Sequence, residues 1–424
     1  MGNMDYFYKK WYKLNDDNKR ESLYNKRFNS ESAIRLGLFI HPLDQSQNFE
    51  LYYIPTNEMI LKIDKIYFLD QILQSYSRML PGVAKDAFLF DIISEELFSS
   101  NELEGVKSSK REIAESAKKI AAGKNLKNAR MHSMIKSYFK LQDGSIDLPK
   151  IPQDVRTMYD YITEGEIDEI NLPDGDIFIT EGAEVAGTGY GKIIHRGVYG
   201  EKNITGHIEK LLNFLQRDDL PMLIKLAIAH YYFGYIHPFY DGNGRTSRFI
   251  ASLYLSQFFS IYTAYSVSIG CRLEHKKYLE LFDKTNKFNS YGEMNFEIDT
   301  FLDILLSGQK YVVEKMQEKK SLLDKADDLL KEDNWLNKEE NLLAQEIVFL
   351  FCQAYFFADN VLSRSEVVDI AQEINVKLSK NEIYRNLDEI EKRKYIIKTK
   401  GRPIEYILNK EFVEQSREVD DYGE

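Results

Sequence analysis

The sequence contains the twelve-residue run His237-Pro238-Phe239-Tyr240-Asp241-Gly242-Asn243-Gly244-Arg245-Thr246-Ser247-Arg248. It combines an imidazole, a carboxylate, two glycines and two guanidinium groups. A carboxylate offers the oxygen ligands that magnesium prefers. Glycines can adopt positive φ, so that backbone N–H groups converge on an anion. The run therefore predicts a site for a nucleotide triphosphate, because that ligand requires all of these groups together.

The residues around this run place it between two helices. An apolar segment with helical character, residues 249–255, follows it directly. We therefore expect the glycine turn at a helix N-terminus, where N–H groups and the helix dipole favour phosphate. On that helix Arg245 and Arg248 share one face and can reach one polyphosphate. Pro238 restricts His237 to extended backbone and ends the preceding helix, and His237 can accept a proton at neutral pH.

The run resembles the signature of the Fic family, H-P-F-x-D-G-N-G-R-x-x-R, and matches every fixed position. Members of that family mostly transfer AMP from ATP to a hydroxyl side chain of a target protein. The resemblance implies a mainly α fold, a Fic-type helical bundle with a short β-hairpin flap. It implies that His237 is the general base and that Asp241 holds Mg²⁺ against the α- and β-phosphates of ATP. The remaining implied ATP contacts are Gly242, Asn243 and Gly244 in the phosphate nest, Arg245 at the phosphates and Arg248 at the γ-phosphate.

A second motif lies upstream, in Ser99-Ser100-Asn101-Glu102-Leu103-Glu104-Gly105. It resembles the inhibitory motif of the same family, S/T-x-x-x-E-G/N, with Ser100, Glu104 and Gly105 at the fixed positions. The resemblance implies that Glu104 pairs with Arg248 and blocks productive binding of the γ-phosphate, since one guanidinium cannot fully serve a carboxylate and a phosphate at once. The simpler alternative is a helix that ends at a C-terminal glycine.

Two weaker matches flank the signature. Relatives carry a Tyr and an Asn near the nucleoside at about the spacing of Tyr278 and Asn286, although an aromatic residue at helical spacing is also typical of a core. Residues 189–200 are rich in glycine and contain the β-branched Ile193 and Ile194, which predicts a β-hairpin. Relatives have a flap here that holds the target segment by strand addition. The absence of the prolines that often follow that flap leaves its register open.

Composition limits the class of protein. The chain has 424 residues, enough for two or three domains, and its 43% hydrophobic and 29% charged content is typical of a folded soluble protein. The sequence has no run of about 18 uncharged apolar residues, so we expect no membrane span. The N-terminus lacks the apolar core of a signal peptide. Two cysteines in apolar surroundings favour a cytoplasmic protein without a disulfide framework. The net charge of −11 disfavours broad nucleic-acid binding.

Periodicity and turn residues predict the order of the elements along the chain. We expect helical and irregular structure to about residue 48, a strand pair at 49–53 and 59–63, helices at 66–80, 84–97, 109–122 and 129–141, a loop-rich stretch at 143–188, and a buried helix at 221–236. In that helix we interpret His230 as a packed, hydrogen-bonded residue. The expected domains are an N-terminal helical region with the inhibitory helix at 1–108, the Fic catalytic core at 109–308, a helical connector at 309–339 and a winged-helix-like domain at 340–412.

The C-terminal segment predicts three helices followed by a hairpin with a Lys-Gly-Arg turn at residues 400–402. Ser363-Arg364-Ser365-Glu366 and Ser379-Lys380-Asn381-Glu382 are two capping boxes that open the second and third of these helices. This order resembles a winged helix. That fold often binds DNA, but acidic residues dilute the positive charge here, so protein contact is favoured slightly over DNA.

Together these features predict a protein adenylyltransferase that moves AMP from ATP to a Tyr, Thr or Ser hydroxyl and is inhibited by its own Glu104. Removal of AMP by the same site, another nucleotide or phosphocholine donor, and a homodimer stay open. The alternative from a different class is a winged-helix transcriptional regulator whose Fic site only senses a nucleotide.

Overall fold

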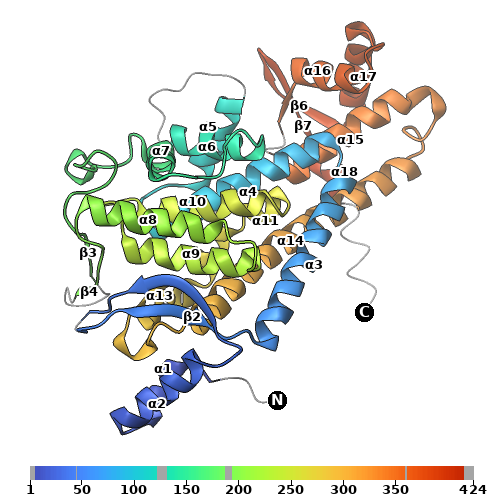
Figure 1. The fold of residues 1–424 in the computed structure, drawn as a ribbon. Helices are drawn as coiled ribbons and strands as arrows, with labels where there is room; N and C mark the ends of the chain where they lie inside the picture. Colours follow the sequence, from blue (N-terminus) through green and yellow to red (C-terminus); the bar gives the residue numbers. More distant parts are fainter. Residues whose placement is uncertain (1–4, 44, 122–130, 187–192, 359–360, 415–424) are drawn as a thin grey trace. The chain divides into compact units, whose positions relative to one another are not determined.

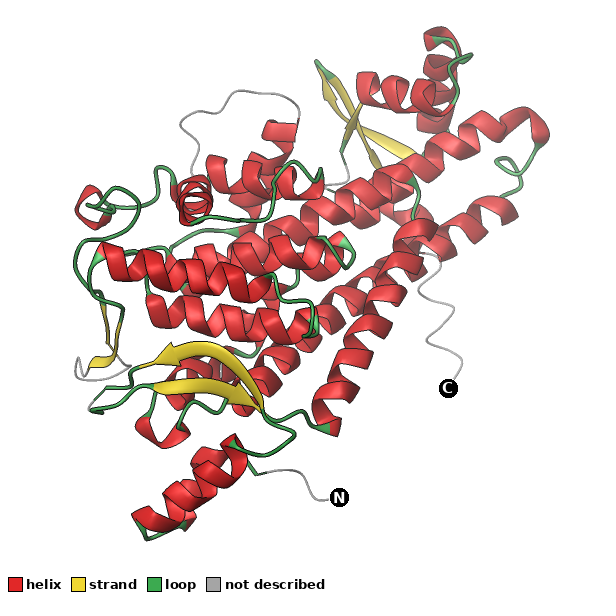
Figure 2. Cartoon of the chain, viewed as in Figure 1, coloured by secondary structure: helices red, strands yellow, loops and turns green. Residues whose placement is uncertain are grey.

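The computed structural model describes residues 5–43, 45–121, 131–186, 193–358 and 361–414. Helices dominate it, and the strands form three small antiparallel sheets (Figure 2). The predicted mainly α fold is therefore confirmed. The chain divides into two compact units, one of residues 1–71 and 92–311 and the other of residues 72–91 and 312–424. These limits differ from the four segments expected from the sequence, because the N-terminal region packs with the signature helices and the connector packs with the C-terminal helices.

The larger unit holds most of the helices that surround the signature. Their bounds are α1 (Phe7–Lys13), α2 (Asp17–Phe28), α5 (Lys110–Ala121), α6 (His132–Gln142), α7 (Pro152–Thr163), η1 (Glu169–Asn171), α8 (Glu201–Leu215), α9 (Met222–Ile236), α10 (Asn243–Ser256), α11 (Ile261–Ala264), α12 (Val267–Leu273), α13 (His275–Thr285) and η2 (Phe288–Ser290). Three longer helices cross the limits between the units: α3 (Asn57–Met79), α4 (Gly82–Leu103) and α14 (Asn295–Glu332).

Helix α9 is the centre of the larger unit, as its apolar sequence predicts. It runs beside α8 and packs on α10 (Figure 1). Thirteen of its residues are buried, including Lys225, whose Nζ donates to the carbonyl of Leu215 at 2.8 Å. A helix that is apolar nearly all round needs neighbours on every side. The rigid position of α9 therefore fixes the residue that follows it, His237.

The first sheet corrects two expectations. Strand β2 (Phe49–Tyr53) lies where predicted, but it pairs with β1 (Ile34–Ile40), inside the region expected to be helical and irregular. Residues 59–63, the expected partner strand, belong to α3 instead. The burial of β1 alternates along its length, so its period of two identifies a half-buried strand. The apolar residues 59–63 continue the helical period of the segment that follows them.

The stretch expected to be loop-rich, residues 143–188, contains α7 and η1 and ends in strand β3 (Glu184–Ala186). Pro152 begins α7 at the first turn, a position that suits its missing N–H. Strand β3 pairs with β4 (Ile193–Arg196), in the register Glu184 with Arg196. The predicted hairpin therefore exists, but its first strand precedes residue 189 and its second ends before Gly197. Residues 189–192 of the predicted hairpin lie outside the described residues.

The smaller unit contains the predicted C-terminal elements. Its helices and strands are η3 (Glu339–Asn341), α15 (Leu342–Phe357), β5 (Leu362–Ser363), α16 (Arg364–Ile374), α17 (Lys380–Lys392), β6 (Ile396–Gly401), β7 (Ile404–Leu408) and α18 (Lys410–Glu414), with strand order β5-β7-β6. Ser363 forms a complete capping box with Glu366, and Ser379 accepts from the backbone N–H of Glu382. The hairpin turn falls at residues 402–403, later than predicted, because Gly401 still pairs with Ile404.

The described part of the chain has no helix that combines the length and the apolar character needed to cross a membrane.

Candidate active site

His237 follows α9 directly as its C-terminal cap. Its backbone N–H donates to the carbonyl of Phe233 at 3.0 Å, and its φ and ψ of 52° and 61° lie in the left-handed region. The extended backbone expected from Pro238 is therefore wrong. A residue with a Cβ in this region is strained, and such strain gathers at functional sites. The turn out of the helix leaves the imidazole half-buried at the start of the signature loop.

The pKa of His237 is lowered by burial, which disfavours the charged imidazolium. A hydrogen bond with the backbone of Gly234 and the negative charges of Glu104 and Asp241 act in the opposite direction. Because burial prevails, His237 is neutral at pH 7. A neutral imidazole is the form that can accept a proton from a hydroxyl.

The loop after His237 is braced by Asn243. Its side-chain Oδ1 accepts from the N–H of Phe239 at 3.0 Å, and its Nδ2 donates to the carbonyl of Phe239 at 2.7 Å. The ring of Phe239 is fully buried and stacks on Tyr159, with 3.8 Å between the ring centroids. The amide of Asn243 is thus committed to the loop itself. Only its backbone N–H remains for the phosphate nest that the resemblance implied.

The two glycines of the loop allow close approaches. Gly242 has a φ of 81° as the N-terminal cap of α10, and its N–H contacts Asp241 Oδ1 at 2.5 Å. A Cβ built on Gly244 would lie 2.1 Å from Oε1 of Glu104. The carboxylate of Glu104 therefore sits directly on the first turn of α10. That turn has unpaired N–H groups and the positive end of the helix dipole, which favour an anion.

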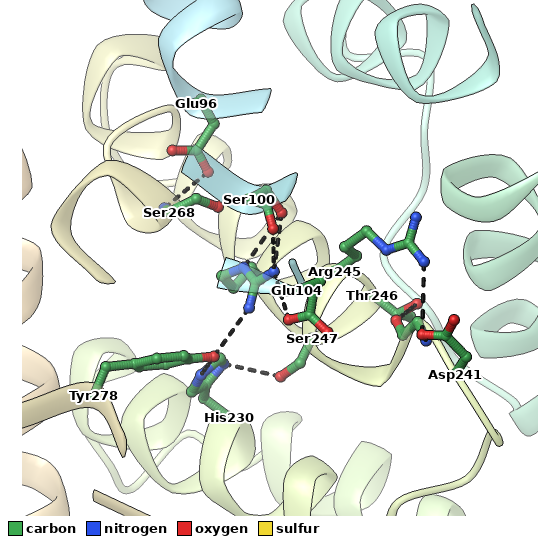
Figure 3. Close-up of polar contacts among 12 residues, drawn as sticks. Glu96, Ser100, Glu104, His230, Asp241, Arg245, Thr246, Ser247, Ser268 and Tyr278 are labelled. Atoms are coloured by element: carbon green, nitrogen blue, oxygen red, sulfur yellow. Dashed lines mark hydrogen bonds and ion pairs between the residues drawn. The ribbon is translucent and has the colours of Figure 1, made fainter. Parts of the chain in front are cut away.

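The two signature arginines have opposite surroundings. Figure 3 shows Arg245 facing Asp241. Arg245 is 1% exposed, yet its Nε and Nη1 have no hydrogen-bond partner in the described part of the chain. The nearest carboxylate oxygen in an ion pair is Oδ1 of Asp241, 3.7 Å from Nη2. Buried polar groups are nearly always paired. The free donors of Arg245 therefore identify a place for an anion that enters beside Asp241.

Arg248, in contrast, is fully paired. It is completely buried, and its Nη2 donates to Oε1 of Glu104 at 2.9 Å and to the carbonyl of Ser100 at 2.9 Å. Its Nε and Nη2 also donate to Oγ of Ser100, at 3.3 and 3.1 Å. The ion pair that the resemblance implied is thus present. It joins residues 144 positions apart in the chain.

Behind Arg248 lies a polar chain that includes Tyr278. Nη1 of Arg248 donates to the hydroxyl of Tyr278 at 3.2 Å, and His230 links that hydroxyl at 3.2 Å to Ser247 Oγ at 2.9 Å. Burial lowers the pKa of His230 to about 3. The interpretation of His230 as a packed, hydrogen-bonded residue is confirmed. Asn286 lies apart from Arg248 and accepts from the hydroxyl of Tyr231 at 2.7 Å.

Sequence reasoning missed Glu96, which anchors helix α4. Its two carboxylate oxygens accept from the backbone N–H groups of Ser268 at 2.9 Å and Ile269 at 3.0 Å, at the first turns of α12. Burial raises the pKa of Glu96 to about 7, although these hydrogen bonds and the charge of Arg248 lower it. Glu96 is one of five acidic residues on α4, so the local sequence did not single it out.

The hairpin expected to act as the flap includes strand β4. Ile193 on this strand is half-buried, and the side chain of Ile194 lies outside the described structure. The hairpin is tied to the site through His195, whose Nε2 donates to the carbonyl of Tyr235 at 2.7 Å. The N–H of Val198 donates to the carbonyl of Ile236 at 2.9 Å. These two bonds fix the base of the hairpin beside His237.

Comparison with known proteins gives a family match for the part of the chain that holds the signature. Residues 151–255 match the model of the Fic/DOC family, and this part of the chain is a Fic/DOC family domain. The chain is also similar to the crystal structure of a Fic family protein from Desulfovibrio desulfuricans, with 15% identity, coverage of 84% of this chain and 97% of that chain, and a TM-score of 0.49. A Fic domain containing signaling protein from Bacteroides thetaiotaomicron matches with 15% identity, coverage of 62% and 97%, and a TM-score of 0.40.

Proposed function

We propose that this protein transfers AMP from ATP to a hydroxyl side chain of a target protein and that Glu104 inhibits the transfer. One observation carries the proposal. Two buried arginines lie on the first turns of α10, shortly after a histidine whose pKa is lowered by burial, and one of them has two donors without a partner in the described part of the chain. Buried guanidinium groups at a helix N-terminus provide the charge and the directed donors that a polyphosphate requires.

In this proposal the oxygen of the target hydroxyl attacks the α-phosphorus of ATP. The new P–O bond forms as the bond to the β-phosphate oxygen breaks, and pyrophosphate leaves. His237 accepts the proton of the hydroxyl. Arg245 contacts the phosphates, and the backbone N–H groups of Gly242 and Gly244 line their path. Positioning and fixed charges would supply most of the acceleration, as in phosphoryl transfer.

The residues present fit a magnesium ion that enters with ATP. Among the described residues no three His, Cys, Asp or Glu side chains gather into a cage for a metal. The partly exposed carboxylate of Asp241 is thus a single protein ligand, as is common for magnesium held jointly by a carboxylate and substrate phosphates. When bound, the ion would neutralise phosphate charge.

The proposed inhibition follows from the position of the Glu104 carboxylate. Its carboxylate occupies the space over Gly244 and holds Arg248, the group proposed to bind the γ-phosphate. An ATP molecule that binds productively would have to displace this carboxylate, since both anions need the same donors. In the reverse reaction, which stays open, Glu104 would align a water molecule for the removal of AMP.

The test is incubation with ATP labelled at the α-phosphate and magnesium. We expect the Glu104→Gly protein to label itself or a lysate protein, and the Glu104→Gly/His237→Ala protein to label nothing. The matched control is Glu102→Gly, which removes a carboxylate from the same helix end without touching Arg248 and should stay as inactive as the wild type. If the Glu104→Gly protein binds ATP and labels no protein, AMP transfer is not its function.

A nucleotide-sensing regulator is the second candidate, and the ion pairs of the smaller unit argue against it. Arg393 pairs with Glu389 at 2.7 Å, Lys400 with Glu405 at 3.1 Å, and Arg364 with Asp388 at 2.9 Å. Basic side chains that are already paired contribute less to phosphate contacts. A gel shift with the promoter of its own operon discriminates the two. A shift that survives His237→Ala would support the regulator, and the absence of any shift would exclude it.

A further inference from the structure

A cavity of about 630 Å³ opens in the larger unit beside the flap. Its walls come from the residues after β1, from the segment that leaves β4, from the first half of α8 and from Tyr235 of α9. None of the signature residues lines it. Its volume is in the range of sites that hold a small ligand or a few side chains.

The lining of this cavity is positively charged. Arg196, Lys202 and Lys210 contribute three cations, and the described residues of the lining include no Asp or Glu. Lys202 and Lys210 are exposed, and within the described residues neither has a hydrogen bond or an ion pair. Arg196 pairs with Glu184 across the hairpin at 3.0 Å, where both side chains are exposed. Such a concave, single-sign surface in a chain of net charge −11 attracts negative ligands.

One wall of the cavity packs against His237, the proposed base. Gly197, which lines the cavity, lies so close to His237 that a Cβ built on it would be 2.9 Å from the Cβ of His237. The next residue, Val198, also lines the cavity and donates to the carbonyl of Ile236. One backbone segment therefore forms both the wall of the cavity and the support of His237. The cavity therefore lies close to the residue to which a target hydroxyl would be presented.

The cavity also has open space beside Gly206, at a helix position where a residue with a side chain would be more stable than glycine. Gly206 lies within α8 and lines the cavity, and a Cβ built on it would meet nothing within 4 Å. Glycine inside a helix is destabilising relative to alanine. Tyr199, which is 69% exposed, lines the same cavity and offers an aromatic surface to a passing chain.

We infer that this cavity binds an acidic segment of the target protein, next to the hydroxyl that is modified. The inference rests on the proposed AMP transfer and adds the class of target to it. Carboxylate side chains would pair with Lys202 and Lys210, which have no other partner in the described structure. A peptide fits better than a nucleic acid, because the cavity lies beside a strand hairpin and the protein as a whole is acidic.

The probe is a short fluorescent peptide with a central Thr and Tyr between runs of glutamate, compared with the same peptide carrying glutamine. Binding is measured by anisotropy to the His237→Ala protein without ATP, so that no reaction takes part. We expect the glutamate peptide to bind at least about tenfold more tightly than the glutamine peptide, with a strong dependence on salt. Lys202→Glu/Lys210→Glu should abolish that difference.

The matched control is Lys19→Glu/Lys26→Glu on α2, which changes the net charge equally with exposed lysines outside the cavity. It should retain the preference for glutamate. Gly206→Phe, which fills the cavity without reversing charge, should weaken the glutamate peptide as well. Equal binding of the two peptides, or a preference that survives Lys202→Glu/Lys210→Glu, would overturn the inference. So would tight binding of polyuridylate that the same two substitutions remove, if the glutamate peptide does not bind.

The experiments distinguish a failure of the inferred peptide binding from a failure of the proposed AMP transfer. If the glutamate peptide binds as expected but the Glu104→Gly protein never transfers AMP, the cavity is a peptide site on a protein with another activity. If AMP transfer occurs and charge reversal in the cavity changes neither binding nor the KM for the glutamate peptide, the target is recognised elsewhere.

Discussion

Glu104 and Arg248 form an ion pair at 2.9 Å in which the arginine side chain is fully buried and the glutamate side chain is 24% exposed. This difference decides which partner can leave. Arg248 is also bound to Ser100 and Tyr278 and cannot move without breaking those bonds. Glu104 is at the end of α4, before the left-handed Gly105, and has access to solvent. Under the proposed inhibition, release therefore requires a movement of Glu104, while Arg248 stays in place for the proposed phosphate contact.

The contrast between the two arginines gives the first prediction. Arg245→Met removes a buried cation with unpaired donors, so we expect it to stabilise the nucleotide-free protein by about 1–3 kcal/mol. Arg248→Met leaves Glu104 and Ser100 without their partner, and we expect it to destabilise by about 3 kcal/mol. Both substitutions should weaken ATP binding. The measurement is urea denaturation without nucleotide. Equal destabilisation by the two would show that Arg245 is paired in solution.

How much of the site could be predicted from the sequence depends on how far apart its residues lie along the chain. The signature is contiguous, so its chemistry could be read directly from twelve neighbouring residues. The pairing of Arg248 with a residue 144 positions away could not be worked out from spacing, and only the family resemblance pointed to Glu104. Glu96 has no such motif. Its role depends on the N-terminus of α12 lying against α4, which is a tertiary contact that no local pattern encodes.

Two predictions from local sequence patterns were wrong, because the neighbouring helix imposed a different conformation. Residues 59–63 contain β-branched and apolar side chains and were expected to form a strand, but they continue the helix α3. His237 was expected to be extended because it precedes proline. The hydrogen bond of its N–H to Phe233 instead holds it as the helix cap. In both cases the surrounding helix outweighs the preference of the residue itself.

Gly244 provides a test of where the Glu104 carboxylate sits. An alanine Cβ there would lie 2.1 Å from Oε1 of Glu104 and 2.9 Å from Nη1 of Arg248. We therefore expect Gly244→Ala to destabilise the wild type by about 1–3 kcal/mol through overpacking, and to cost clearly less in the Glu104→Gly background. Thermal denaturation of the four proteins of this double-mutant cycle measures the coupling. Additive effects would mean that the carboxylate does not rest on Gly244.

Glu96 should make stability depend on pH in a recognisable way. Burial raises its pKa to about 7 in the folded protein, above its ordinary value of 4.5. The folded state therefore binds the proton more tightly, so the contribution of Glu96 is fully present below about pH 4.5 and is lost as the pH rises through about 7. Glu96→Gln does not titrate. The free energy of unfolding of the variant, minus that of the wild type, should thus increase by about 3 kcal/mol between these pH values. Glu102→Gln, at a carboxylate that remains partly exposed on the same helix, is the control that should show no such change.

His237 should remain neutral at a lower pH than an ordinary histidine, and Glu104 should set how much lower. Burial lowers the pKa of His237, whereas the nearby negative charges of Glu104 and Asp241 raise it. Removal of one of those charges in Glu104→Gln should therefore lower the pKa of His237 further, because the imidazolium loses an attractive partner. The measurement is a titration of the imidazole C–H resonances by NMR, with His237→Ala to assign the signal. The wild type should titrate below 6.5 and Glu104→Gln lower still, while Glu102→Gln leaves the midpoint unchanged. A midpoint that rises in Glu104→Gln would place the carboxylate too far from the imidazole to act on it, and the inhibitory glutamate would then not adjoin the proposed base.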